Sequence, residues 1–234
     1  MGAIFQVKTR LIFTVSIFLS VVAAKAAGDP AADGAAVLKA MKVAQTSQHM
    51  NLSGSLRTGP VTVPLQLIID GSVIKYEFKD PAVTLVLRLG DKGSQLQEVT
   101  RSGTEKITPA RFDAKVRGSD ISYEDLSMRF LYWPQVALVG EDTKLLRRCW
   151  KVQVEPDGVD SQYSKVLLWV DEGSQALLEA DAFDKSGKLA RKFVVRSVQK
   201  SKVDGVYILK QMRIEAPGAK EDKLSYLEIS GEEK

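Results

Sequence analysis

The sequence contains few of the residues on which most enzyme and metal sites depend. Its 234 residues include one histidine, His49, and one cysteine, Cys149. A Ser-His-Asp or Cys-His site needs a histidine beside the nucleophile, and a structural zinc site needs four clustered ligands. No Gly-rich phosphate-binding loop occurs, and one cysteine cannot form an internal disulfide. We therefore expect no catalytic residue, no metal ion and no cofactor, and we expect that the protein is not an enzyme.

His49 and Cys149 have simpler interpretations. His49 follows the first segment with helical periodicity, and a histidine at a helix C-terminus interacts favourably with the helix dipole. Cys149 lies in "RRCWKVQV", an alternating stretch that predicts a strand, where a lone cysteine is usually a small buried side chain. We expect His49 to interact with the end of a helix and Cys149 to be a buried thiol.

Two pairs of carboxylates are the remaining candidates for acid–base chemistry. They are Glu124 with Asp125, and Glu179 with Asp181. Because charged side chains are rarely fully buried, we expect both pairs to be solvated surface charges.

The N-terminus has the three parts of a secretory signal peptide. Lys8 and Arg10 form a positive region, residues 11–22 are the apolar run "LIFTVSIFLSVV", and "AAKAA" supplies small residues for cleavage. The alternative is an uncleaved membrane anchor, but the apolar run is shorter than the ~20 residues that span a bilayer. We interpret residues 1–26 as a signal peptide and expect the protein in a bacterial periplasm.

The remainder of the chain has little net charge. Removal of residues 1–26 takes away Lys8, Arg10 and Lys25 and no acidic residue, which lowers the net charge from +4 to +1. The other basic pairs, as in "LLRRCW", are interleaved with acidic residues. Because a nucleic-acid-binding surface needs clustered positive charge, we exclude nucleic acid as a partner.

Strand signals dominate residues 27–234, which we interpret as a single domain. After a predicted helix at about residues 30–47, segments of alternating apolar and polar residues are separated by short turns such as Asp70-Gly71. We count about 10–11 strands, and so many antiparallel strands tend to curl. The predicted fold class is mainly β (α+β): a strongly curved antiparallel sheet, or unclosed β-barrel, with helices that cover or plug its concave face.

One segment in the middle of the chain differs from its surroundings. "SDISYEDLSMRFLYWP", residues 119–134, is here called the central segment. Ser122 and Asp125 match a capping box, Pro134 ends the pattern, and a helix is predicted at about residues 122–133. Its apolar residues are spaced by three or four and share one helix face. They are Tyr123, Leu126, Phe130 and Trp133.

Several segments resemble one family of bacterial exported proteins. They are "GSDISYEDLSMRFLYWP", "CWKVQVEP", "VLLWVDEGSQALLEADAFDKSGKLARKFVV" and "VYILKQMRIEA". Together they resemble the outer-membrane lipoprotein-sorting family, within the LolA/LolB-like superfamily of periplasmic lipoprotein carriers. The resemblance covers about residues 35–230 and is strongest from Gly118 onward.

The resemblance implies a carrier that holds acyl chains in a hydrophobic cavity. Its implied partners are a lipid or acylated lipoprotein as cargo, an inner-membrane donor complex and an outer-membrane acceptor, and we expect a monomer. The candidate residues of the cavity or its lid are Tyr123, Leu126, Phe130, Trp133, Trp169 and Phe193.

Other functions remain compatible with the same sequence. The central segment either completes the core or closes a cavity that cargo can enter. On the same fold, the protein is either a carrier, a lipid- or lipoprotein-sensing domain, or an interaction module without cargo. A carboxylate pair in a polar cleft would favour an enzyme.

Overall fold

A computed structural model describes residues 30–90, 93–158, 161–201 and 207–232. The predicted signal peptide, residues 1–26, lies outside the described residues. In the described part of the chain, no helix is both long and apolar enough to span a membrane.

The strands form one antiparallel sheet in the order β6-β5-β4-β3-β2-β1-β13-β12-β11-β10-β9-β8-β7. Strands that are consecutive in the sequence pair with each other, except β6 and β7, and β1 also pairs with β13. This last pairing joins the first and last strands in the middle of the sheet, and it leaves β6 and β7 as edges. The strands are β1 (His49–Thr58), β2 (Val61–Asp70), β3 (Val73–Phe78), β4 (Val83–Gly90), β5 (Gly93–Thr100), β6 (Gly103–Lys106), β7 (Gln135–Lys144), β8 (Arg147–Glu155), β9 (Tyr163–Asp171), β10 (Leu177–Asp184), β11 (Leu189–Lys200), β12 (Tyr207–Glu215) and β13 (Ser225–Glu232).

The predicted fold class is confirmed, although the sheet has 13 strands rather than 10–11. The two missed strands are β6 and β7. The four residues of β6 are exposed and carry no alternation. The β7–β8 turn contains Leu145 and Leu146, whose φ angles are 51° and 62°. Leucine rarely adopts this left-handed conformation, so the sequence has no turn signal there.

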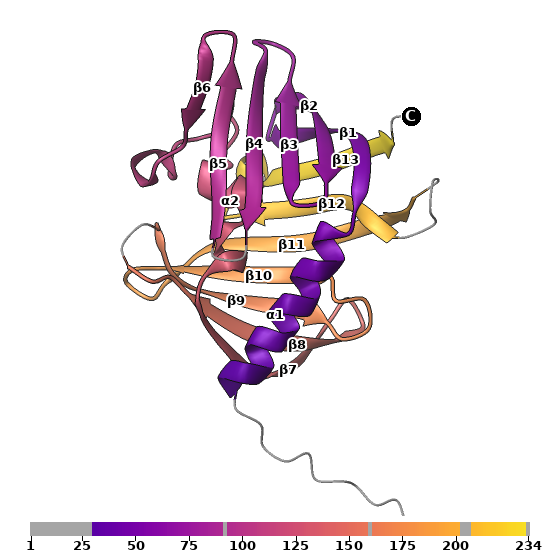
Figure 1. The fold of residues 1–234 in the computed structure, drawn as a ribbon, viewed down its shortest axis with the longest axis vertical. Helices are drawn as coiled ribbons and strands as arrows, with labels where there is room; N and C mark the ends of the chain where they lie inside the picture. The colour runs from indigo at the N-terminus through magenta and orange to yellow at the C-terminus, as the bar shows by residue number, and fades with distance from the viewer. Residues whose placement is uncertain (1–29, 91–92, 159–160, 202–206, 233–234) are drawn as a thin grey trace, which may run out of the picture.

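The sheet curves strongly between its two halves. Figure 1 shows β2 to β6 along the long axis of the molecule and β8 to β12 crossing below them. The strand registers are irregular in β1, β10 and β11. Bulges of this kind increase the local twist and bend a strand, so they contribute to the curvature that produces a concave inner face.

The first helix, α1 (Pro30–Thr46), matches the predicted helix at 30–47 to within one residue. It packs against β7 and β8, with Leu38 and Met41 buried. Gly34 makes the close approach possible, because a Cβ there would lie 2.6 Å from the backbone nitrogen of Leu138 in β7. The helix therefore packs on β7 and β8 and adds Leu38 and Met41 to the core.

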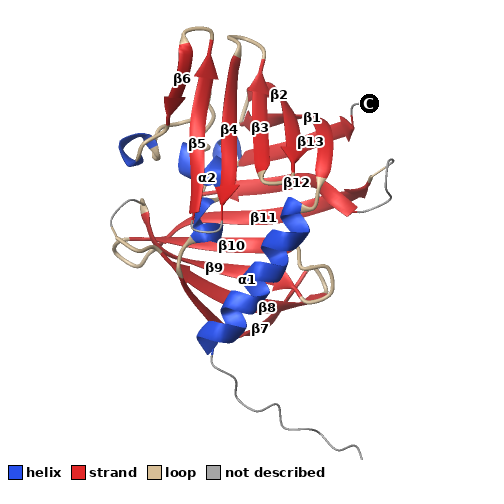
Figure 2. Cartoon of the chain, in the orientation of Figure 1, coloured by secondary structure: helices blue, strands red, loops and turns tan. Residues whose placement is uncertain are grey.

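The central segment lies inside the curve of the sheet. It contains the short helix α2 (Tyr123–Ser127) and the 3-10 turn η2 (Arg129–Tyr132). Figure 2 shows α2 where the upright strands meet the crossing strands. The hydroxyl of Tyr76 in β3 donates to the carbonyl of Leu126 at 3.2 Å, and Phe130 packs on Phe193 of β11. The segment therefore contacts both halves of the sheet. Two further 3-10 turns lie on either side of it in the sequence, η1 (Pro109–Arg111) and η3 (Glu221–Lys223).

Candidate functional site

The central segment begins as predicted but does not form one continuous helix. The Ser122 hydroxyl accepts from the Asp125 N–H, and the Asp125 carboxylate accepts from the Ser122 N–H, both at 3.0 Å. This capping box confirms the predicted start. Met128, with φ at 43°, then interrupts the helix and separates α2 from η2. The prediction of a helix through residue 133 is corrected, because a left-handed methionine leaves no mark in a sequence pattern.

After the break at Met128, the aromatic side chains of the central segment lie toward the half of the sheet that contains β11. The ring centroids of Phe130 and Phe193 are 5.3 Å apart, and those of Phe130 and Trp133 are 6.4 Å apart. Leu126 is buried in the same core. These four predicted residues therefore lie in one apolar interior, and Phe130 and Phe193 are completely buried.

Tyr123 lies at the rim of this interior. Its ring is buried, and its hydroxyl donates to Glu98 of β5 at 3.2 Å. The guanidinium of Arg111 lies 5.4 Å from the centre of the ring and also binds Glu98 at 2.8 Å. Tyr123 therefore joins the apolar interior to a polar group at its edge.

The placement of Trp169 with these residues is corrected. In β9, Leu168 and Val170 face the interior, so Trp169 lies on the outer face of the sheet, where it packs with Cys149 and Leu178. Its indole N–H donates to Asp142 at 2.8 Å. The ammonium groups of Lys144 and Lys151 lie over its ring, at 4.2 and 5.1 Å from the centre. Because side chains alternate along a strand, Trp169 has no access to the interior.

Glu124 and Asp125 are completely buried, so their prediction as surface charges was wrong. The carboxylate of Glu124 accepts from the Ser161 hydroxyl at 2.6 Å and from the Gln162 N–H at 3.0 Å. These partners precede β9 and lie almost forty residues away in the sequence. They satisfy both oxygens of a carboxylate that burial would otherwise destabilise strongly.

Asp125 is held by groups from two strands. The phenol of Tyr163 in β9 donates to its carboxylate, and the guanidinium of Arg191 in β11 lies 3.4 Å away. Arg191 also donates to the carboxylate and the carbonyl of Asp120, at 3.0 and 2.8 Å. Arg191 therefore binds the central segment at two of its residues from the inner face of the sheet.

Burial changes the proton affinities of these groups. It raises the pKa of Glu124, although the hydrogen bonds from Ser161 and Gln162 oppose the change. It also raises the pKa of Tyr163 far above the ordinary tyrosine range, with the Asp125 carboxylate adding to the effect. Burial lowers the pKa of Arg191, but attraction to Asp125 and Asp120 outweighs it and raises the pKa overall. Arg191 is therefore charged inside the fold.

The other two carboxylates lie on the outer face of the sheet. Glu179 binds Lys144 at 2.8 Å, and Asp181 lies 3.5 Å from Lys192. Their side chains are only 11% and 14% exposed, so they are less solvated than predicted. Each has a lysine partner.

Cys149 and His49 have separate, structural surroundings. Cys149 is a buried free thiol in β8, as predicted. His49 begins β1 rather than ending a helix, and its Nδ1 lies 2.8 Å from the exposed carboxylate of Asp70. The predicted role of His49 is corrected because α1 ends at Thr46. Among the described residues, no group of three or more His, Cys, Asp or Glu is arranged to hold a metal ion.

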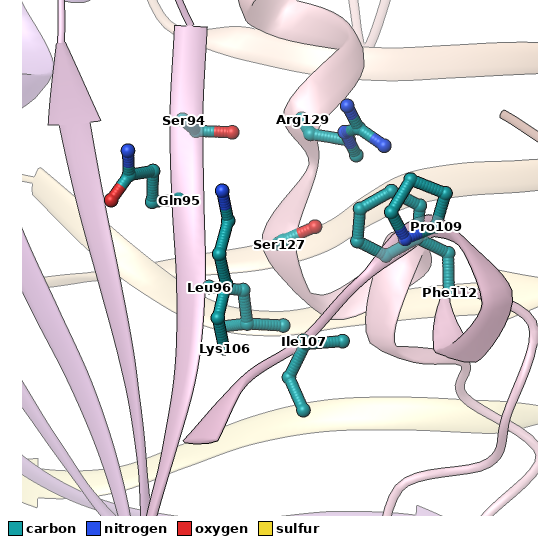
Figure 3. Close-up of a pocket in the computed structure, with 9 residues that line it drawn as sticks. All are labelled: Ser94, Gln95, Leu96, Lys106, Ile107, Pro109, Phe112, Ser127 and Arg129. Atoms are coloured by element: carbon teal, nitrogen blue, oxygen red, sulfur yellow. The ribbon is translucent and has the colours of Figure 1, made fainter. Parts of the chain in front are cut away.

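A pocket of about 200 Å³ lies between β5, β6 and the central segment. Its lining combines buried apolar side chains with hydroxyl, amide and cationic groups. Figure 3 shows Lys106 and Ser94 on one side of the pocket and Arg129 on the other. The lining residues are Ser94, Gln95, Leu96, Lys106, Ile107, Pro109, Phe112, Ser127 and Arg129. Sequence reasoning missed this site, because its residues come from three separate segments.

Solved structures with the same fold come from several bacteria. An outer membrane lipoprotein-sorting protein domain from Vibrio parahaemolyticus has a TM-score of 0.69 at 14% identity, covering 87% of this chain and 92% of that one. A LolA superfamily protein from Nitrosomonas europaea has 0.62 at 14%, covering 86% and 92%. A DUF1329 family protein from Desulfovibrio piger has 0.61 at 21%, covering 87% and 92%. At these identities the likeness establishes the fold.

The predicted resemblance is thus confirmed at the level of the fold. No curated protein matches the sequence. A family model described as "Uncharacterized protein" matches residues 100–233, which is more than half of the chain. The chain therefore belongs to that family of uncharacterized proteins and has the LolA-like fold.

Proposed function

We propose that this protein is an exported periplasmic carrier that binds the acyl chains of a lipid or lipoprotein inside its curved sheet. One observation carries the proposal. The concave face of a LolA-like sheet is filled by a segment that belongs to no strand, through Leu126, Phe130 and Trp133. Acyl chains offer the same kind of surface as these side chains, so they replace the segment without exposing the sheet to water.

The magnitude of acyl binding supports a filled interior. Each buried CH₂ group contributes about 0.8 kcal/mol, so a chain of about sixteen carbons contributes roughly 12 kcal/mol. Two or three such chains would exceed the practical ceiling of about 18–21 kcal/mol for non-covalent affinity. A carrier must also release its cargo. Displacement of Phe130 and its neighbours offsets part of the gain, which keeps binding reversible.

The other side of the central segment is suited to release. Asp125 and Glu124 bind Arg191 and the Ser161 region through polar contacts. A buried ion pair contributes little net stability because its members lose hydration. When the segment moves out, water replaces these partners. The phenol of Tyr132 is buried without a hydrogen-bond partner, which destabilises the filled state further.

A closed interaction or sensing module is the second candidate function, and one observation favours it. The pocket beside the central segment, at about 200 Å³, is smaller than the roughly 300–1,000 Å³ of sites that enclose a small molecule. In this alternative the central segment is permanent core, and the outer surface binds a protein. A donor complex in the inner membrane and an acceptor in the outer membrane belong to the carrier function only.

Mass spectrometry of bound lipid tests the proposal. The full chain is exported in a bacterium and purified from the periplasm without detergent, and its lipid extract is quantified against protein. We expect phospholipid or acylated peptide at a fixed stoichiometry, and uptake of a fluorescent acyl probe by the delipidated protein. Trp169→Ala is the control. It removes an aromatic side chain from the outer face, so lipid content and probe uptake should stay unchanged. Lipid-free protein that takes up no probe would establish the closed module.

A further inference from the structure

The end of the β11–β12 hairpin projects beyond the strands on either side of it. The pairing of β10 with β11 reaches only Val194, and the pairing of β13 with β12 reaches only Gln211. Within the described residues, β11 therefore pairs with β12 alone from Ser197 to Lys200. Figure 1 shows this end of the hairpin at the right of the molecule. Since Ile208 is buried in the core, the hairpin is held in place while its outer side chains face the surroundings.

Three cations lie on this end of the hairpin without a neutralising partner. Arg196, Lys200 and Lys210 are exposed, and none of them forms an ion pair with a described residue. Residues 202–206 lie outside the described part and contain one lysine and one aspartate, so they add no net charge. Because residues 27–234 carry a net charge of +1, the three cations leave a net charge of −2 on the rest of them. The net positive charge of the domain therefore comes from this hairpin.

The arginines of the β7–β8 hairpin differ, because each has an acidic partner. Arg147 binds the carboxylate of Asp171. The guanidinium of Arg148 lies 3.2 Å from the carboxylate of Glu141 and 3.7 Å from that of Glu172. The unpaired positive charge at this edge of the sheet is therefore on the β11–β12 hairpin.

Exposed apolar side chains accompany the cations. Val198 and Tyr207 on the β11–β12 hairpin are 50% and 72% exposed. Leu145 and Leu146 in the β7–β8 turn are 54% and 99% exposed, and both have positive φ angles. Asparagine or glycine would suit this backbone better and would expose no large apolar side chain. Neither the local conformation nor the core accounts for two leucines at this turn, so a contact outside the chain is the simplest reason for them.

The two hairpins end at the same edge of the sheet. In an antiparallel sheet the turns alternate between the two ends of the strands, so the β7–β8, β9–β10 and β11–β12 turns share one end. Leu146 and Lys200 lie five and six residues toward that end from one row of paired residues. Strands β8 and β11 are about 14 Å apart across the sheet at the usual spacing. The members of the row are Lys151, Trp169, Glu179 and Val194.

A bilayer surface that contains anionic phospholipid matches this combination of side chains. A lysine or arginine near such a surface strengthens binding by about fivefold. Tyrosine favours the headgroup level, and exposed leucines gain by entering the boundary with the acyl chains. The negative charge on the rest of the domain is repelled by the same surface, so the field of the protein turns the hairpins toward it.

We propose that these two hairpin ends dock the protein on a bilayer that contains anionic phospholipid. The docking edge is defined by the three cations and Tyr207 of the β11–β12 hairpin together with Leu145 and Leu146. This inference goes beyond the proposed binding of acyl chains. Because the docking edge lies outside the interior, docking and acyl binding are measured separately and either one can fail alone.

Flotation of the exported protein with vesicles tests the docking edge. Vesicles of phosphatidylglycerol and phosphatidylcholine in equal parts are compared with vesicles of phosphatidylcholine alone. We expect the native protein to favour the mixed vesicles. The combined variant Arg196→Gln, Lys200→Gln and Lys210→Gln should bind them about a hundredfold more weakly, at about fivefold for each charge.

A matched control removes three charges from the opposite end of the strands. It changes exposed lysines in the β3–β4 and β10–β11 turns and in the β12–β13 connection to glutamine, and it should bind as the native protein does. These lysines are Lys79, Lys188 and Lys220. Leu146→Asn tests the apolar contribution, because asparagine tolerates a positive φ angle. We expect it to bind mixed vesicles about tenfold more weakly.

Each outcome decides the assignment. Native protein that does not bind mixed vesicles would overturn docking, and its uptake of the fluorescent acyl probe without vesicles then tests the carrier function alone. Equal binding to both kinds of vesicle would overturn anionic phospholipid as the partner. Equal weakening by the two combined variants would overturn this edge as the site. An unchanged Leu146→Asn would remove the leucine turn from the docking edge. Binding of polyglutamate as tight as that of mixed vesicles would replace the bilayer with an acidic protein.

Discussion

Strands β9 to β11 carry aromatic and charged side chains on both faces, and the two faces differ in what covers them. On the inner face, Phe193 and Arg191 are covered by the central segment. On the outer face, Trp169 and Lys192 contact only side chains of the sheet itself in the contacts described above, and they face solvent. Substitutions on the inner face therefore report on a segment that belongs to no strand. Those on the outer face report on the sheet alone.

The largest expected difference between the faces is in the uptake of an acyl probe. Truncation of a buried phenylalanine costs about 3–5 kcal/mol. In Phe130→Ala this cost falls on the filled state, so the open state becomes more populated and apparent probe affinity rises by about a hundredfold or more. Trp169→Ala should leave the affinity unchanged. Fluorescence titration of both variants measures the contrast.

Global stability distinguishes a movable segment from permanent core in the same variants. If the segment releases before the sheet unfolds, its contacts are absent from the last folded state. The free energy of unfolding of Phe130→Ala then decreases by less than the ~3–5 kcal/mol expected for truncating a buried phenylalanine. A full loss of about 3–5 kcal/mol in urea unfolding, with no gain in uptake, would assign the central segment to the core.

The second contrast concerns the cations. Arg191→Leu leaves Asp125 buried without its cation, and removal of one partner of a buried pair costs about 3–5 kcal/mol. The lower end applies here, because Tyr163 and the Ser122 N–H still bind Asp125. Lys192→Leu removes a partly exposed pair and should cost under about 1 kcal/mol. Urea unfolding at neutral pH measures both, and equal losses would show that the inner pair is effectively hydrated.

Local signals in the sequence were sufficient to predict the sheet and the start of α2. The hairpin at Asp70-Gly71 and the capping box at Ser122 depend on residues within a few positions of each other. By contrast, the break at Met128 and the turn at Leu145-Leu146 use left-handed residues that any pattern reads as helix or strand. The prediction failed where backbone conformation is imposed by packing.

The candidate site was predictable only in part, for the same reason. The aromatic pattern placed Phe130 in the interior, but Glu124 is buried because Ser161 and Gln162 approach it from a distant loop. Trp169 lies in "VLLWVD", where apolar residues fall on both faces of β9. Without alternation, residue type alone cannot distinguish the inner from the outer face.

The faces should also respond to pH with opposite sign. Burial raises the pKa of Glu124, so its ionised form destabilises the fold, and this penalty is absent below the ordinary glutamate pKa of about 4.3. Glu124→Gln should therefore be more stable than the native protein at pH 7 and equal to it near pH 4. The amide preserves one acceptor for Gln162 and one donor for Ser161.

Asp171 on the outer face is the matched comparison. Hydrogen bonds from Arg147 hold the pKa of its carboxyl well below the usual range, against the effect of burial. Its contribution to stability is therefore complete above the ordinary aspartate pKa of about 3.9 and is lost as pH falls further. Asp171→Asn should be less stable than the native protein at pH 7. Unfolding curves from about pH 2 to pH 7 check both signs, and parallel curves for Glu124→Gln and the native protein would contradict the first.

The smallest expected effect comes from Tyr132, which carries the buried, unpartnered hydroxyl of the central segment. Burial raises the pKa of this phenol to about 12, so it is neutral at pH 7. Tyr132→Phe removes a polar atom that has lost its water and gained no partner, which stabilises the filled state by about 1 kcal/mol. The ring and its contact with Lys42 remain. Because cargo must displace that state, probe affinity should fall by about fivefold. The control is Tyr226→Phe, whose ring contacts the guanidinium of Arg57, and it should leave probe affinity unchanged. A gain in stability with unaltered probe affinity would separate the hydroxyl from any opening of the interior.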